Sequence, residues 1–170
     1  MGARRKAREL ALQMLFQHDM SGNTPEMIIG TFEELQKAKP NTREFSTRIF
    51  RGTVEHMPDI DDKIQNQAEN WRLSRMAAVD RNIIRMSVYE FLHESDTPKL
   101  VIIDEAIEIA KKYGTQKSPQ FINGILDGIL KRYNLGRGDE RVVRQPIDDE
   151  DDDADDLPEI VDEPLPQQEP

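Results

Sequence analysis

The sequence contains no cysteine among its 170 residues. Disulfides, thiolate zinc sites, cysteine nucleophiles and CxxC redox motifs are therefore excluded. The longest uninterrupted apolar runs, such as Leu100–Ile103, have four residues, far fewer than a membrane-spanning helix needs. The basic N-terminal stretch leads into an interrupted, amphipathic segment, which is unlike a signal peptide. We therefore expect a cytoplasmic protein with no membrane partner.

The negative charge is confined to one end of the sequence. Residues 139–170 hold 14 acidic and two basic side chains, a charge of −12, whereas residues 1–138 hold 19 and 21, a charge of +2. The acidic segment also has five prolines and no aromatic residue, so it cannot bury enough apolar surface to offset the entropy lost on ordering. We predict one folded domain over residues 1–138 and a disordered acidic tail over residues 139–170.

Apolar side chains recur at three- and four-residue spacing through most of residues 1–138, which is the period of amphipathic α-helices. Thr24-Pro25 and Ser118-Pro119 are each typical of a capping residue followed by proline in the first turn, and Gly114 is a candidate C′ residue. The sequence predicts an all-α protein, a compact bundle of about seven helices. The expected helices cover approximately residues 4–21, 24–35, 41–57, 60–71, 79–92, 100–113 and 118–133.

Four cations fall within five residues near the N-terminus: Arg4, Arg5, Lys6 and Arg8. They lie where a helix macrodipole is already positive, which is unfavourable unless an anion binds. Guanidinium groups match the geometry of phosphate, and a basic cluster on a helix is typical of a nucleic-acid interface. The alternative is a solvated, fraying helix end with incidental charge, and the local sequence leaves both interpretations open.

A second candidate site is the segment Gly114-Thr115-Gln116-Lys117-Ser118. It has one glycine and follows a helix, so it does not fit the GxxxxGK[ST] loop of a nucleotide-binding site. If Ser118 caps the next helix, the free N–H groups there, with Lys117 beside them, could hold one phosphate. The alternative is an ordinary turn between helices. Phe16 and Phe121, near the two basic segments, could stack on unpaired bases if exposed, although Phe121 also fits an apolar helix stripe.

No catalytic or metal-binding motif is present. His18, His56 and His93 are scattered without zinc-ligand spacing, and there is no GxSxG elbow. Acidic clusters at two helix starts, Asp59–Asp62 and Asp104–Glu108, are explained by the macrodipole. We expect a non-enzymatic protein that has no cofactor and no metal.

Four stretches keep a characteristic order and spacing: ARRKARE at 3–9 with ALQMLF at 11–16, VDRNIIRMSVYE at 79–90, IDEAIEIAK at 103–111, and FINGILD at 121–127. Together they resemble the bacterial transcription antitermination factor NusB family over about residues 3–133. The resemblance implies two helical halves and a factor that binds the boxA element of nascent ribosomal RNA together with the ribosomal protein NusE. That pair recruits further Nus factors to elongating RNA polymerase and suppresses premature termination.

The resemblance also implies which residues act. Asp80, at the start of a helix, would face NusE. Phe16 stands where some family members have tyrosine, which keeps a stacking ring and loses a hydroxyl donor. The implied RNA contacts are the basic cluster Arg4, Arg5, Lys6 and Arg8, and a second group made of Lys117, Ser118 and Phe121.

The acidic tail is outside the family pattern. We consider two interpretations of it, a solvating appendage and a tethered competitor of RNA for the basic cluster.

Two alternatives to the antitermination function are open. One is an RNA-modifying enzyme, because a similar helical domain precedes the catalytic domain in some RNA cytosine methyltransferases, but this sequence has no cofactor-binding βαβ region. The other is a protein-only helical adaptor or a homodimeric interaction module without specific RNA binding.

Overall fold

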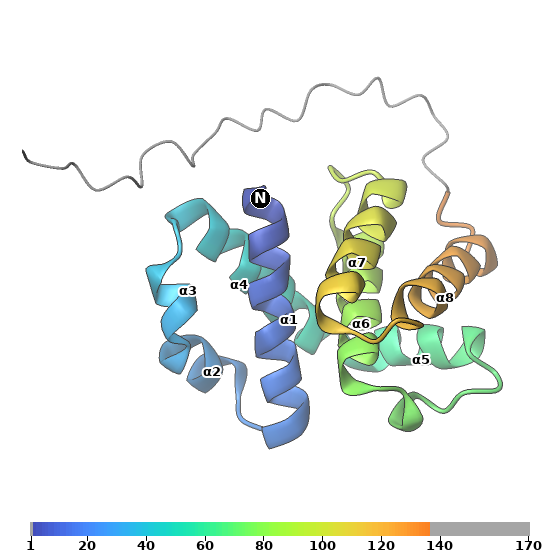
Figure 1. Cartoon of the computed structure of the whole chain (residues 1–170), viewed down its shortest axis with the longest axis horizontal. Helices are drawn as coiled ribbons and strands as arrows, with labels where there is room; N and C mark the ends of the chain where they lie inside the picture. Colours follow the sequence, from blue (N-terminus) through green and yellow to red (C-terminus); the bar gives the residue numbers. More distant parts are fainter. Residues whose placement is uncertain (1, 137–170) are drawn as a thin grey trace, which may run out of the picture.

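The computed structural model describes residues 2–136 and confirms the all-α prediction. Within this range the chain forms eight α-helices and one 3-10 helix and no strand (Figure 1). The predicted acidic tail lies outside the described residues. The helices are α1 (Ala3–Ser21), α2 (Pro25–Thr31), α3 (Glu33–Lys37), α4 (Pro40–Glu55), α5 (Met57–Gln67), the 3-10 helix η1 (Leu73–Arg75), α6 (Ala78–His93), α7 (Lys99–Tyr113) and α8 (Ser118–Arg132).

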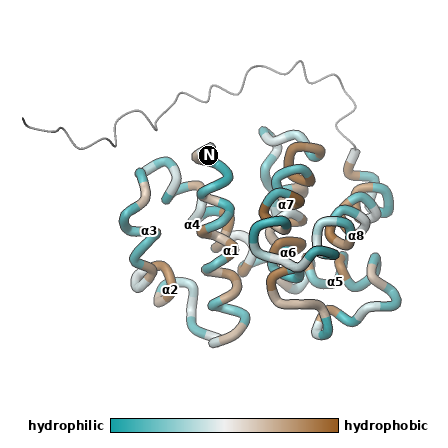
Figure 2. Tube along the Cα trace, in the orientation of Figure 1, coloured by the Kyte–Doolittle hydropathy of each residue, from teal (hydrophilic) through white to brown (hydrophobic). Residues whose placement is uncertain are grey.

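The helices form two halves. Helices α1 to α4 lie side by side on the left of Figure 1 and α5 to α8 on the right, with α6 packed against helices of both. Apolar stretches alternate with hydrophilic ones along α7 and α8 (Figure 2), as expected for helices that bury one face. The halves therefore share one continuous core of buried residues.

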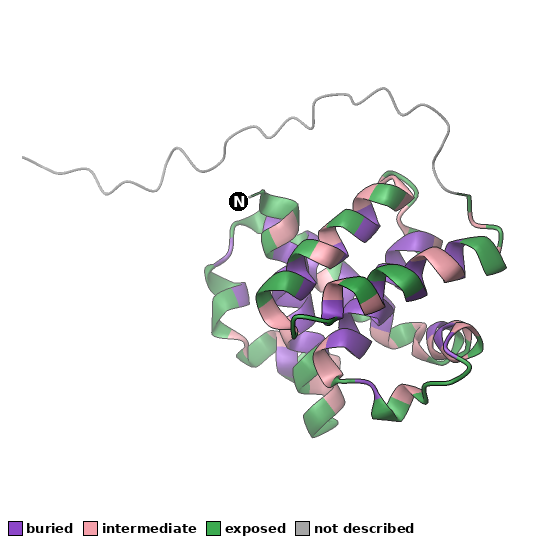
Figure 3. Cartoon of the chain, turned by 45° about the vertical axis from the view of Figure 1, so that its right-hand side comes forward, coloured by how far each residue is buried: buried purple, intermediate pink, exposed green. Residues whose placement is uncertain are grey.

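Helix α6 is the centre of the fold. It packs against α1, α4, α5, α7 and α8, and every residue from Asp80 to Phe91 is buried. Figure 3 shows the buried residues, in purple, gathered in the middle of the molecule. Because other helices surround it, α6 has no solvated face for its polar residues, and buried polar groups are costly unless they are paired. Six such residues are buried on α6: Asp80, Arg81, Asn82, Arg85, Ser87 and Glu90.

The two arginines of α6 pair with carboxylates from other helices. Arg81 donates to Oδ2 of Asp19 on α1, at 3.0 Å from Nε and 2.7 Å from Nη2, and its Nη1 donates to two backbone carbonyls of the segment before α6. Arg85 donates to both carboxylate oxygens of Asp61 on α5, at 2.8 and 2.9 Å. These bonds fix α1 and α5 to the same helix.

The predicted helix over residues 24–35 is interrupted. Phe32 has an extended backbone (φ −83°, ψ 98°) and separates α2 from α3. Gly30 and Thr31 before it are weak helix formers, and Thr31 Oγ1 donates back to the Met27 carbonyl at 2.8 Å. The break adds one helix to the expected seven.

The helix expected to reach residue 71 ends at Gln67. Gln65 explains the early end, because its side-chain amide satisfies the backbone of the following loop. Its Nε2 donates to the carbonyls of Ala68 and Trp71 at 3.2 and 3.1 Å, and its Oε1 accepts from the N–H of Leu73 at 2.9 Å. Trp71, expected on an apolar stripe, is instead 60% exposed in this loop.

Gly52 allows α4 to approach α6 closely. A Cβ at this position would overlap the ring of Tyr89. That ring is buried and stacks with His93, with 5.0 Å between the ring centroids, so it has little freedom to move aside.

The substitution Gly52→Ala is expected to lower the free energy of unfolding by about 1–3 kcal/mol, because an added methyl overpacks this contact. The matched control is Gly30→Ala, since a Cβ at Gly30 meets nothing within 4 Å; its stability should be unchanged or higher by up to about 1 kcal/mol. Urea unfolding of both variants measures the difference. Equal stabilities would contradict the close approach.

The Asp19 network predicts a pH dependence. Burial alone would raise the pKa of Asp19, but hydrogen bonds from Arg81 and Asn82 and the charge of Arg85 hold that pKa below its ordinary value. A depressed pKa stabilises the fold above the unfolded value near 3.8, and this stability is lost as the pH falls through the folded-state pKa.

Asp19→Asn is therefore expected to cost about 2 kcal/mol at neutral pH, because charged hydrogen bonds are lost. Thermal unfolding should show the gap to the wild type closing as the pH falls from about 5 to about 2. A gap that is constant over this range would mean that the charge of Asp19 contributes nothing.

Candidate nucleic-acid interface

Helix α1 begins with uncompensated positive charge. Gly2, its N-cap residue, provides no side-chain cap, and the first turn contains no acidic residue. Arg4 and Lys6 are exposed, and neither forms an ion pair with a described residue. Free N–H groups and cations at one helix end together make a surface that attracts anions.

The Arg4 guanidinium shares an aromatic ring with two other guanidinium groups. It lies 4.0 Å from the centroid of the Phe45 ring, and those of Arg8 and Arg48 lie 5.3 and 5.2 Å from it. Burial, followed by the positive charges of Arg8 and Arg48, lowers the pKa of Arg4 below its ordinary value. Arg8 and Arg48 are paired with Glu90 and Glu94, so among the three guanidinium groups Arg4 is the one with no carboxylate partner within the described residues.

Arg8 has a different environment from the rest of the basic cluster. It is 3% exposed, and its Nε and Nη2 donate to the Glu90 carboxylate of α6 at 2.9 and 2.8 Å. The basic cluster predicts an RNA contact at this residue. The structure instead gives Arg8 a buried partner. At this position the inward face of α1 meets the Glu90 carboxylate of α6, and Glu90 is 1% exposed.

Arg5 joins α1 to α7. Its Nε and Nη2 donate to the two carboxylate oxygens of Glu105, both at 2.9 Å, and the side chain is one-third exposed. Lys112 of α7 donates to Glu9 of α1 at 3.1 Å. The two cross-links run in the same direction along both helices, so α1 and α7 are parallel and the α7–α8 turn lies beside the middle of α1 (Figure 1).

Ser118 does not cap α8 in the expected way. Lys117 is the N-cap residue, and the buried Oγ of Ser118 accepts from the N–H of Thr115 at 2.9 Å, so the hydroxyl stabilises the preceding turn. Gly114 has an extended backbone rather than a left-handed one, and it is required because a Cβ would lie 2.5 Å from Ser118 Oγ. Lys117 is exposed and forms no ion pair with a described residue, which leaves it as the accessible cation of the turn.

The two phenylalanines differ in exposure. Phe16 on α1 is 40% exposed. Phe121 on α8 is half-buried, packs against the core and meets the ring of Trp71 edge-on. Both rings keep exposed surface that a base could reach.

Asp80 is buried rather than presented on the surface. It lies in the first turn of α6, where a carboxylate is favourable for the macrodipole. Its Oδ1 has no hydrogen-bond partner among the described residues. A direct contact of Asp80 with a protein partner stays a prediction.

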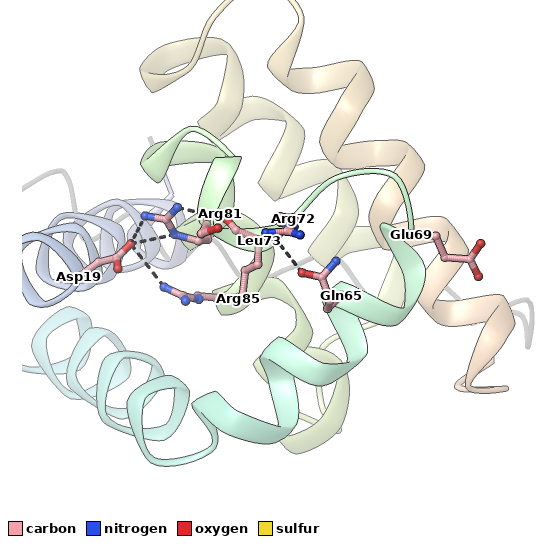
Figure 4. Close-up of a pocket in the computed structure, with 8 residues that line it drawn as sticks. Asp19, Gln65, Glu69, Arg72, Leu73, Arg81 and Arg85 are labelled. Carbon is pink, nitrogen blue, oxygen red and sulfur yellow. Dashed lines mark hydrogen bonds and ion pairs between the residues drawn. The ribbon is translucent and has the colours of Figure 1, made fainter.

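A cavity of about 750 Å³ lies next to the Asp19 network (Figure 4). The sequence does not predict this cavity, because Asp19, Arg81 and Arg85 come from different helices and each fits a helix pattern. The donors of Arg81 and Arg85 are occupied by carboxylates and carbonyls, which leaves the exposed Arg72 as the lining arginine that a ligand would meet. The sequence gives one indication of such a network, which is that Arg81 and Arg85 are charged residues within its most apolar helix pattern.

No group of three or more potential metal ligands occurs within residues 2–136. In the same part of the chain no helix has the length and apolar character to cross a membrane.

A model of the NusB family matches residues 5–131. The chain belongs to the NusB family. It is 51% identical to a transcription antitermination protein NusB of Trichlorobacter lovleyi over 128 residues, 75% of this chain and 89% of that relative. Its fold is similar to that of T. maritima NusB, with a TM-score of 0.69, 42% identity, and coverage of 75% of this chain and 90% of that one.

The fold is also similar to a chain in the crystal structure of antitermination factors NusB and NusE in complex with dsRNA. The TM-score is 0.71 with 26% identity, over 77% of this chain and 98% of that chain.

The NusB-family basic motif is expected to divide into structural and surface residues. Arg8→Ala should cost about 3–5 kcal/mol, because Glu90 would be left as a buried charge without its partner. Lys6→Ala should change stability by less than about 0.5 kcal/mol, because Lys6 is exposed. Chemical unfolding of the two variants decides this, and similar losses would contradict the division.

Proposed function

We propose that this protein is a transcription antitermination factor that binds the boxA element of nascent ribosomal RNA together with ribosomal protein NusE. One observation carries the proposal: this member of the NusB family opens α1 with two exposed cations, Arg4 and Lys6, that have no acidic partner in the described chain. Relatives that carry the antitermination name, and a related structure that contains NusE and RNA, support it.

The proposed RNA contacts divide by chemistry. Arg4, Arg5, Lys6 and Lys117 are proposed to meet phosphates, which gives affinity and orientation without sequence preference. Phe16 and Phe121 are proposed to stack on bases. Stacking requires unpaired bases, so we propose a single-stranded target although the related complex holds dsRNA. Arg8 and Ser118 act behind this surface, the first by holding α1 against α6 and the second by shaping the turn.

The role is proposed to be non-catalytic and to require no cofactor. Other Nus factors and RNA polymerase would be reached through the RNA and NusE in the cytoplasm, where the transcript is made. Asp80 stays the proposed residue of the NusE side. A homodimer that covers the RNA surface is a further proposed state of the free protein.

The test is fluorescence anisotropy with a boxA single strand, a scrambled strand and a duplex, with and without NusE. The boxA strand is expected to bind best and to bind more tightly when NusE is added. Arg4→Ala with Lys6→Ala should weaken binding to all strands and flatten the slope of log affinity against log salt by about 1.4, because two phosphate contacts are lost.

The matched control is Lys37→Ala with Lys39→Ala, which removes two exposed cations at the end of α3 and should leave the slope unchanged. Weak, equal binding to all three RNAs that NusE does not alter would contradict the proposal. That result would favour the protein-only adaptor or the homodimeric module.

A further inference from the structure

A second cavity lies between the loop after α5 and the start of α8. Its volume is about 380 Å³, at the lower end of the range for small-ligand pockets. Residues Gln67–Trp71 form one wall, and Gln120, Phe121 and Gly124 form the other.

Two aromatic rings form a corner in this cavity. Trp71 is 60% exposed, and its ring lies 6.3 Å from that of Phe121 at an interplanar angle of 69°. The backbone of Trp71 is held by Ala68 and by the Gln65 amide, and its ring contacts that of Phe121. A flat group that stacks on one ring would present its edge to the other, and both arrangements are favourable for aromatic pairs.

No contact within the described residues requires a glycine at position 124. Glycine in the interior of a helix is destabilising relative to alanine, yet a Cβ at Gly124 would meet nothing within 4 Å. Gly128, one turn later, differs, because a Cβ there would overlap the side chain of Gln67. Gly124 is exposed and lines the cavity, so the missing side chain leaves room for a group from outside.

The rim of the cavity offers hydrogen-bonding groups suited to a base edge. Asn70 and Gln120 are exposed, and their side-chain amides form no hydrogen bond within residues 2–136. An amide provides both donors and acceptors, which is how proteins contact the edges of unpaired bases. Arg132 also lines the cavity, although Gln67 and Glu69 already engage its guanidinium.

We infer that this cavity binds one unpaired nucleobase of the RNA, stacked in the corner between Trp71 and Phe121 and lying against Gly124. The inference rests on the proposed function and adds a base-binding position to it. Phe121 belongs to both sites, and Lys117 precedes it by one helical turn. The strand therefore passes from a cation that contacts phosphate to a pocket that holds a base.

Trp71 is the single tryptophan of the sequence, so its fluorescence reports on this cavity alone. The full-length protein is titrated with the boxA single strand while tryptophan emission and anisotropy of the labelled RNA are both recorded. Stacking of a base on the indole is expected to quench the emission with the same Kd that anisotropy gives.

Two variants and a control accompany the titration. Trp71→Ala should weaken RNA binding about 10-fold, the effect of removing one stacked base. Gly124→Ala should raise the Tm, because alanine favours the helix, and still weaken RNA binding several-fold, so a folding defect cannot explain its loss. Met27→Ala removes an equally exposed apolar side chain from α2, in the other half (54% exposed), and should bind RNA like the wild type.

Abasic substitution along the RNA locates the base. At one RNA position, removal of the base should weaken binding to the wild-type protein. The same removal should not weaken binding to the Trp71→Ala variant any further, because the two changes remove the same contact.

The outcomes separate this inference from the proposed function. If the boxA strand binds selectively but the emission does not change and both variants keep wild-type affinity, the inference is overturned and the proposed function stands. If no RNA binds selectively, the proposed function fails first, and the inference with it. If NusE alone quenches Trp71 and Trp71→Ala weakens only NusE binding, the cavity is a protein-docking surface and the inference is wrong.

Discussion

The buried charges of α6 constrain the rest of the structure. Glu90 and Arg81, two and a half turns apart on an enclosed helix, each need a partner of opposite sign inside the protein. Both partners come from α1: Arg8 for the first and Asp19 for the second. Buried pairs add little net stability compared with apolar packing, but an unpaired buried charge is very costly. The pairs therefore fix the register of α1 on α6, because a shift of α1 along its axis would leave buried charges without a partner at both ends.

Fixing α1 in this way divides the basic N-terminal motif. Arg8 turns to the core, and Arg5 meets α7 through Glu105. Arg4 and Lys6 are left at the surface, together with the unsatisfied N–H groups of the first turn. The accessible positive charge is thus smaller and more localised than the four adjacent cations suggest. The same α1–α7 contacts bring the α7–α8 turn, which carries Lys117, alongside α1.

Three glycines differ in whether a neighbouring side chain of the protein requires the absence of a Cβ. Gly52 and Gly128 are explained by neighbours within the protein, Tyr89 and the Gln67 amide, that leave no room for a Cβ. Gly124 meets open space at an aromatic corner instead. A fold optimised only for stability would place alanine there. The proposed RNA surface therefore combines cations positioned by ion pairs on α1 with a base pocket on α8 that the packing itself does not need.

The sequence by itself determined the all-α class, most helix boundaries and the family, because hydrophobic periodicity and capping residues are local properties. It did not predict the break at Phe32 or the end of α5, which depend on side-chain to backbone bonds such as those of Gln65. Only the tertiary structure decided which cation of the N-terminal motif is buried and that Trp71 is exposed. Burial and pairing depend on residues far apart in the chain, as with Arg8 and Glu90, which are 82 positions apart, and local spacing carries no information about such partners.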